Sequence, residues 1–212
     1  MRKIIWFNLI TLDGYFEGPN REIDWHNVDD EFNVFAAEQL DSMDVLLFGR
    51  VTYEMMASYW PSEMAVTNDP VIAEKMNTKS KIVYSTTLEK ADWSNTTLIK
   101  ENIVRETTRL KQQPGRDMAI FGSAVLGNAL LDAGLIDEIR VLVNPVVLHS
   151  GHPLFRDGSE KLHLKLLTSR NFKNGNVLLV YQPAIRVKQN SLWQRIVHIF
   201  RPADRQRVRE QV

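Results

Sequence analysis

The chain contains no cysteine among its 212 residues. This absence excludes disulfide bonds, iron–sulfur clusters, thiolate nucleophiles and zinc sites built from cysteine. Histidines are few and scattered, without the H-x-x-x-H or H-E-x-x-H spacing that brings two imidazoles together on a helix. They are His26, His149, His152, His163 and His198. No metal site is therefore predicted.

The sequence also lacks long apolar runs and an overall charge. No run approaches the roughly 20 apolar residues of a membrane-spanning helix. The start MRKIIWFNLITLDG is predicted to be a first strand, because no small-residue cleavage site of a signal peptide follows it. We therefore expect a cytoplasmic protein. Basic and acidic residues number 26 each, so net charge does not favour a nucleic-acid partner.

Charge is nevertheless unevenly distributed along the chain. Residues 184–212 hold seven basic and two acidic residues, whereas residues 1–183 hold 19 basic and 24 acidic ones. The hydrophobic content of 44% and the length suit one domain with a buried core. We predict a single domain over residues 1–183, followed by a basic, partly amphipathic extension over residues 184–212.

Two well-known phosphate-binding motifs are missing as well. Residues 122–127 read GSAVLG, which lacks the three-glycine dinucleotide register, and Gly127 is not followed by the Lys-Ser/Thr of a Walker A loop. Residues 117–143 still predict a strand, a glycine turn at Gly122, a helix with Ser123 at its N-cap and Gly134 at its C′ position, and a second strand. Such a strand-to-helix turn can hold a phosphate, or it can be a plain βαβ unit without a ligand.

The rest of the pattern favours an α/β fold with a mostly parallel central sheet flanked by helices and antiparallel strands near the C-terminus. Strands are predicted at residues 4–10, 45–48 and 82–84, and helices after the acidic cluster 29–31 and at 51–57, 70–76 and 103–112. Residues 59–70 are predicted to be a loop. Residues 162–167 and 177–181 flank a turn at 173–176 and predict a hairpin.

Three predicted strands end in a small or polar turn. These ends are Phe48-Gly49-Arg50, Tyr84-Ser85-Thr86 and Phe121-Gly122-Ser123. In a parallel sheet the carboxyl ends of the strands share one edge, where ligands bind. The guanidinium of Arg50 suits a phosphate, and the hydroxyl groups of Ser85 and Thr86 are further donors. The combination favours a nucleotide-binding enzyme.

The ordered set TLDGYFEGPN, DVLLFGRVTYEMM, KIVYSTT, AIFGSAVLGNALLDAGLIDEIRV and NPVVL with GHPLF resembles the dihydrofolate reductase-like superfamily. The branch that it resembles includes the reductase domain of riboflavin biosynthesis. The resemblance covers residues 2–182. It implies the dihydrofolate reductase fold, NADPH as the cofactor, hydride transfer to a heterocyclic, pterin- or aminopyrimidine-like substrate, and a homodimer.

The resemblance also implies roles for individual residues at the cofactor. Gly49, Arg50 and Thr52 match the turn at the adenosine end of NADPH, with Arg50 on the 2′-phosphate. Ser85 and Thr86 match a second turn at that end. The pyrophosphate-binding turn is matched by a third set, in which family members often have two or three consecutive glycines. This set is Gly122, Ser123, Ala124 and Leu126.

At the substrate end, Thr11, Asp13 and Gly14 match the family's loop beside the nicotinamide. Trp25 and Asp30 have the five-residue spacing of the family's tryptophan and its carboxylate, which binds the pterin and assists protonation. Asp13 and Asp30 are therefore the candidate catalytic acids. Each has a plain alternative, since an acid before glycine is common in turns and acids are favoured at helix starts.

The tail places Leu192, Ile196, Ile199 and Phe200 on one predicted helical face. This face could dock on a partner subunit or contact an anionic membrane, or it could belong to an extension that packs on its own domain or is partly disordered. The alternative for the whole chain is a non-catalytic nucleotide-binding or interaction protein that retains the fold.

Overall fold

The computed structural model describes residues 1–157 and 161–184. Its helices are α1 (Asp30–Ser42), α2 (Arg50–Tyr59), α3 (Glu63–Asn68), α4 (Pro70–Thr78), α5 (Ile103–Gln112) and α6 (Ala124–Asp132). Its strands are β1 (Ile4–Thr11), β2 (Tyr15–Glu17), β3 (Met43–Gly49), β4 (Ser80–Tyr84), β5 (Thr96–Ile99), β6 (Asp117–Phe121), β7 (Glu138–Asn144), β8 (His152–Pro153), β9 (Leu164–Asn171) and β10 (Val177–Pro183). The predicted tail face, Leu192 to Phe200, lies outside the described residues.

The core of the fold is an eight-stranded sheet in the order β5-β4-β3-β6-β1-β7-β10-β9. Neighbouring strands from β5 to β7 pair in parallel, and β10 pairs antiparallel with both β7 and β9. A separate ribbon joins β2 to β8. This is the predicted architecture, a parallel centre with an antiparallel end.

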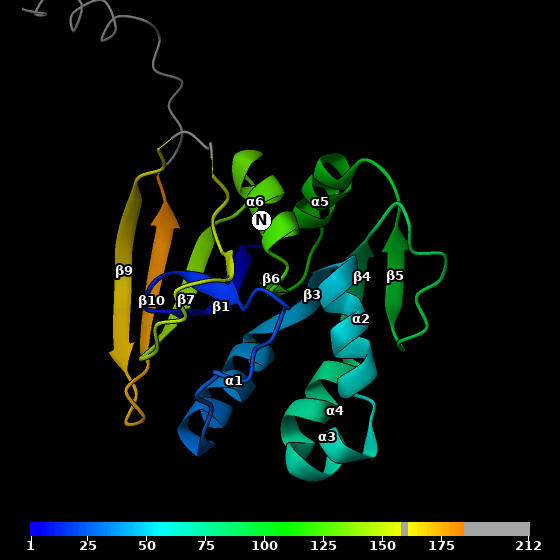
Figure 1. The fold of residues 1–212 in the computed structure, drawn as a ribbon. Helices are drawn as coiled ribbons and strands as arrows, with labels where there is room; N and C mark the ends of the chain where they lie inside the picture. Colours follow the sequence, from blue (N-terminus) through cyan, green and yellow to red (C-terminus); the bar gives the residue numbers. More distant parts are fainter. Residues whose placement is uncertain (158–160, 185–212) are drawn as a thin grey trace, which may run out of the picture.

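Helices cover both faces of the sheet, with α5 and α6 on one side and α1, α2 and α4 on the other (Figure 1). Alternate residues of β1 supply the two cores. Ile4 and Trp6 pack with Leu126 and Leu130 of α6, whereas Ile5 packs in the core that includes Leu40 of α1. Because both faces are buried, β1 is almost continuously apolar.

Local sequence signals explain several element boundaries. The side chain of Asp29 accepts a hydrogen bond from the Phe32 amide and caps α1, and Pro70 begins α4. Gly134 follows α6 with φ +69°, its amide donates to the Leu131 carbonyl, and the Leu135 amide donates to the Leu130 carbonyl. This pair of bonds is a Schellman motif, which ends the helix at the predicted glycine.

The structure corrects one predicted segment. Residues 59–70 are not a continuous loop, because α3 forms within them and is capped by the Ser62 hydroxyl, which accepts from the Ala65 amide. A six-residue helix is too short to show a clear apolar period, so the sequence pattern missed it. The predicted C-terminal hairpin is confirmed, with β9 and β10 joined by the turn at residues 172–176.

Candidate functional site

The three predicted strand-end turns lie at one edge of the sheet. Strand β3 lies between β4 and β6, with Gly49 opposite Tyr84 and Leu47 opposite Ile120. All three strands are parallel, so their carboxyl ends point the same way. The turns at 49–50, 85–86 and 122–123 are therefore neighbours, although 73 residues separate the first from the last.

The helices α2 and α6 begin at this edge without a side-chain cap, a feature that α4 and α5 share. The N-caps of α2 and α6 are Gly49 and Ser123, and neither makes a side-chain hydrogen bond to its own helix. Neither helix has an acidic residue in its first turn, whereas α1 and α3 have both a side-chain cap and acidic first turns. The positive ends of α2 and α6 are left available to an anion.

The two helix starts are joined by a reciprocal pair of hydrogen bonds. The Gly49 amide donates to the Ser123 hydroxyl oxygen at 3.0 Å, and the Ser123 amide donates to the Thr52 hydroxyl oxygen at 3.1 Å. Gly122 and Ser123 are both left-handed, with φ of +64° and +52°. A Cβ at Gly122 would lie 3.2 Å from Thr52 Cγ2, so the turn packs tightly against α2.

Arg50 places a positive charge at the start of α2. Its Nη1 lies 2.8 Å from Glu54 Oε2, one helical turn along α2, and both side chains are almost half exposed. Such an exposed i,i+4 pair contributes only about 0.3–0.5 kcal/mol. A phosphate oxygen can therefore replace the carboxylate of Glu54 at little cost.

The turn after β4 borders a cavity. The Ser85 hydroxyl oxygen accepts from the Thr87 and Leu88 amides and so orders the turn itself. Thr86 is exposed and lines a cavity of about 770 Å³ that is wide open to solvent, together with residues 100–105 and Ala129 of α6. The cavity thus lies between the turn after β4, the start of α5 and one side of α6.

Strand β1 extends beyond the end of its neighbour β6 at the same edge of the sheet. Pairing between them stops at Phe7 opposite Phe121, whereas β1 continues to Thr11 beside β7. The Lys3 and Phe7 carbonyls accept from the Met118 and Gly122 amides, so odd-numbered residues of β1 turn their backbone groups toward β6. The peptide groups of Leu9 therefore point into the space beyond the end of β6.

Thr11, Asp13 and Gly14 form an ordered loop after β1. The buried Thr11 hydroxyl donates to Asp13 Oδ1 at 2.6 Å and accepts from the Tyr15 amide. The Asp13 carboxylate also accepts from the Leu148 and His149 amides, and these bonds, with that of Thr11 foremost, lower its pKa. Gly14 has φ +88°, and its carbonyl accepts from the Leu154 amide. Asp13 thus joins two loops as an ionised carboxylate.

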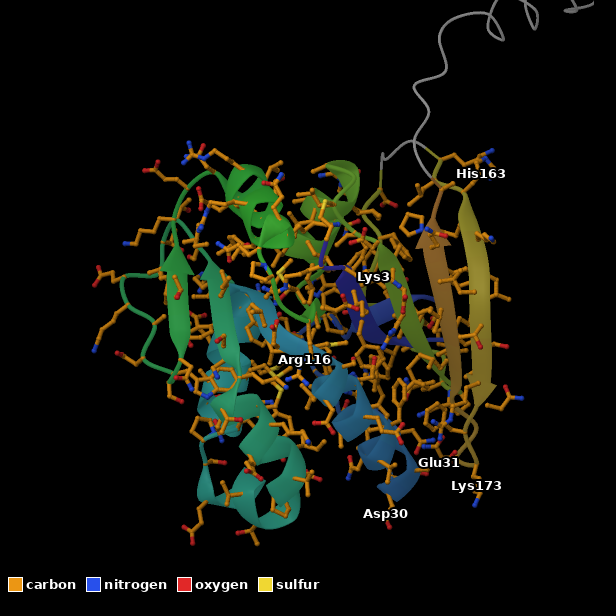
Figure 2. All side chains as sticks on the ribbon, turned by 180° about the vertical axis from the view of Figure 1, so that it is seen from behind. Lys3, Asp30, Glu31, Arg116, His163 and Lys173 are labelled. Carbon is orange, nitrogen blue, oxygen red and sulfur yellow. The ribbon has the colours of Figure 1, made fainter. Side chains whose placement is uncertain are left out.

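Asp30 is not brought into this arrangement. It is exposed in the first turn of α1 and extends from the end of that helix (Figure 2). Its neighbour Glu31 faces the β9–β10 hairpin, where it accepts from Arg170 and from the Lys173 amide. Trp25 is half-buried on the preceding loop and lies edge-on to His26, and its Nε1 has no hydrogen-bond partner within residues 1–157 and 161–184. The geometry of Asp30 is that of a helix-start acid.

Sequence reasoning missed two contributors to the site. The Nε1 of Trp6 donates to the Gly122 carbonyl at 3.0 Å. From the sequence, Trp6 is predicted only to be a core residue. Its contact with Gly122 depends on the pairing of β1 with β6, which the sequence pattern does not specify. The second contributor is the pair of peptide groups of Leu9. Their position depends on the lengths and register of β1 and β6, which the residue types do not predict.

Residues 1–157 and 161–184 include no group of three or more histidines and carboxylates that could hold a metal ion. Within these same residues, no helix has the length and apolarity needed to cross a membrane.

Comparison with known proteins identifies the family. The family model described as RibD C-terminal domain matches residues 2–178. The uncharacterized protein YyaP of Bacillus subtilis (strain 168) is 34% identical over 180 residues, which cover 85% of this chain and 94% of that protein. A putative riboflavin biosynthesis protein from Shewanella sp. PV-4 has a similar structure, with a TM-score of 0.66, 24% identity and coverage of 86% and 99%.

Dihydrofolate reductase from Enterococcus faecalis, complexed with NADP(H), has the same fold, with a TM-score of 0.58 and 13% identity over 85% of this chain and 96% of the other. The predicted dihydrofolate reductase-like fold is confirmed. The chain belongs to the RibD C-terminal domain family.

Proposed function

We propose that this protein is an NADPH-dependent reductase that transfers hydride to a heterocyclic, pterin- or aminopyrimidine-like substrate. The observation that carries the proposal is the adjacency of the α2 and α6 starts, both without an own-helix side-chain cap and without first-turn acids, beside Arg50. A dinucleotide needs such an anion site for its pyrophosphate, with a further cation for a 2′-phosphate.

The residues present fit the adenosine end of NADPH. Among the described residues, the Arg50 side chain pairs with the exposed Glu54 carboxylate, and it can turn to the 2′-phosphate. The cavity beside Thr86 has room for a purine ring, and its wall carries the two positive charges of Lys100 and Arg105 against the one negative charge of Glu101. Gly122, Ser123, Ala124 and Leu126 would hold the pyrophosphate through the start of α6.

The reducing end belongs beside β1. NADPH, when bound, supplies the hydride for the reduction. The Leu9 peptide groups offer one donor and one acceptor next to the end of β6, a pattern that matches a carboxamide. Thr11 and Gly14 shape the loop that borders this position, and exposed Leu12 adds an apolar surface suited to a ring.

Neither candidate acid, Asp13 or Asp30, is well suited to donate a proton to the substrate. The lowered pKa of Asp13 keeps it ionised near neutral pH, and its oxygens are engaged by Thr11, Leu148 and His149. Asp30 is exposed at the end of α1. We therefore assign the proton to water, and Asp13→Asn tests the assignment. It should lower stability through the loop without changing the pH dependence of kcat.

A direct test is to titrate the protein with NADPH and NADH by calorimetry and then to screen pterins and aminopyrimidines for oxidation of the bound cofactor. Tight NADPH binding with turnover of one ring class supports the reductase. NADPH binding without turnover on any of them supports the non-catalytic nucleotide-binding alternative. Absence of NADPH binding contradicts the reductase and favours an interaction protein that retains the fold.

A further inference from the structure

The Ser123 side chain does not make the hydrogen bond that the side chain of an N-cap serine ordinarily makes. An N-cap hydroxyl usually accepts from an amide in the first turn of its own helix. The Ser123 hydroxyl makes no such bond to α6, and accepts instead from the Gly49 amide at the start of α2. The residue is buried, so this bond is shielded from water.

The backbone conformation of Ser123 also indicates that the hydroxyl group has a role at this turn. A φ of +52° costs a serine more than a glycine, for which left-handed backbone carries almost no penalty. Glycine would therefore form this turn more easily. The one thing that serine adds is the hydroxyl, and this hydroxyl is committed to the other helix.

The return bond makes the link reciprocal. The Ser123 amide donates to the Thr52 hydroxyl, so Gly49, Thr52 and Ser123 connect the two helix starts in both directions. Each hydroxyl oxygen accepts a backbone N–H, and neither hydroxyl proton has an acceptor among the described residues. The link therefore uses the acceptor capacity of each hydroxyl oxygen, which neither glycine nor valine can supply.

We propose that Ser123 is a positioning residue that fixes the spacing of the α2 and α6 starts, so that both address one diphosphate. The role rests on the proposed cofactor function. A glycine at this position would leave the turn flexible. The two hydrogen bonds of the link hold the turn in one conformation instead. A preorganised anion site binds more tightly because less ordering remains to be done on binding.

The test compares NADPH and inorganic pyrophosphate as probes of the full-length protein by calorimetry. Ser123→Gly keeps the turn conformation and removes the hydroxyl, and we expect NADPH and pyrophosphate each to bind roughly 5- to 20-fold more weakly, in line with loss of one buried hydrogen bond. The KM for NADPH should rise while kcat at saturating cofactor stays within about twofold. A merely structural serine would change the melting temperature and leave both affinities in place.

Further variants keep the test decisive if Ser123→Gly folds poorly. Thr52→Val removes the return acceptor and should weaken binding, while Thr52→Ser keeps the oxygen and should restore it. Ser123→Gly combined with Thr52→Val should cost less than the sum of the two, because they break one link. Ser58→Ala, at the exposed far end of α2, is the matched control and should bind like the parent.

The outcomes separate the two proposals. If the parent protein binds neither NADPH nor pyrophosphate, the cofactor proposal fails, and the role of Ser123 fails with it. If the parent binds both and the Ser123→Gly and Thr52→Val variants bind equally well, the positioning role alone is wrong.

Discussion

The indole Nε1 of Trp6 donates a 3.0 Å hydrogen bond to the Gly122 carbonyl, so a fully buried side chain of β1 holds the turn that follows β6. The same indole lies against α6. A Cβ at Gly127 would be 2.1 Å from Trp6 Cε2 and 2.5 Å from its Nε1. Trp6 therefore couples the core, the α6 backbone and the candidate pyrophosphate turn.

Gly127→Ala should be destabilising despite the better helix propensity of alanine. The added methyl must displace the indole, and overpacking of this kind costs about 1–3 kcal/mol. We expect a lower denaturation midpoint in urea and weaker NADPH binding, since the indole also holds Gly122. Trp6→Phe in the same chain should make the two changes cost less than their sum. Additive costs would show that Trp6 and Gly127 are not coupled.

Arg50→Ala should weaken NADPH far more than NADH. Loss of a charge-assisted hydrogen bond typically costs about 1.5–3 kcal/mol, or roughly 10- to 100-fold in affinity. Glu54→Gln frees Arg50 and should strengthen NADPH binding by up to about twofold, because the pair is exposed. Calorimetric titration measures all of these. Equal affinities of the parent for the two cofactors would rule out the role of Arg50.

Much of this site could be predicted because short local signals define it. Gly49 ends the buried strand β3, Gly122 follows β6, and each precedes a helix, while Gly134 lies in the Schellman motif that ends α6. The sequence order also predicted the parallel centre and the antiparallel end of the sheet. These features depend on residues within a few positions of one another, which is the range over which sequence patterns are informative.

The rest depends on contacts between distant segments. The Ser123 hydroxyl accepts from Gly49, 74 residues away, where the sequence predicted an ordinary N-cap. The loop after β1 is ordered by the 148–149 amides through Asp13. The short strand β5 and helix α3 were missed because few residues carry their pattern. Such features follow from the assembled sheet and not from spacing.

Gly122→Val should abolish cofactor binding and leave a folded protein. The substitution requires a β-branched residue at φ +64°, and its Cβ would press on Thr52. Gly134→Val is the matched control, because it puts the same side chain on a left-handed glycine, φ +69°, with no atom within 4 Å of the new Cβ and outside the candidate site. Circular dichroism checks the fold and calorimetry the affinity. Normal NADPH binding by Gly122→Val would contradict the assignment of this turn.

Truncation after Pro183 tests the expected dimer and the role of the tail. If Leu192, Ile196, Ile199 and Phe200 pack on a partner subunit, the truncated protein should have half the mass in solution by light scattering. If they contact a membrane, the full chain alone should sediment with anionic vesicles, in a salt-dependent way. A truncation that alters neither property shows that the tail is a solvated extension.

Folding stability should fall as the pH drops from about 6.5 to 4, because of His26. Burial lowers the pKa of His26 from 6.5 to about 4, and its Nε2 has no hydrogen-bond partner in the part of the chain that the structure describes. Over this range His26 binds a proton in the unfolded chain but not in the folded protein, so acid favours unfolding. The contribution is complete above pH 6.5 and is lost as the pH approaches 4. Urea unfolding across this range should show the slope, and His26→Phe should flatten it. A His26 imidazole that titrates near 6.5 by NMR in the folded protein would contradict the prediction.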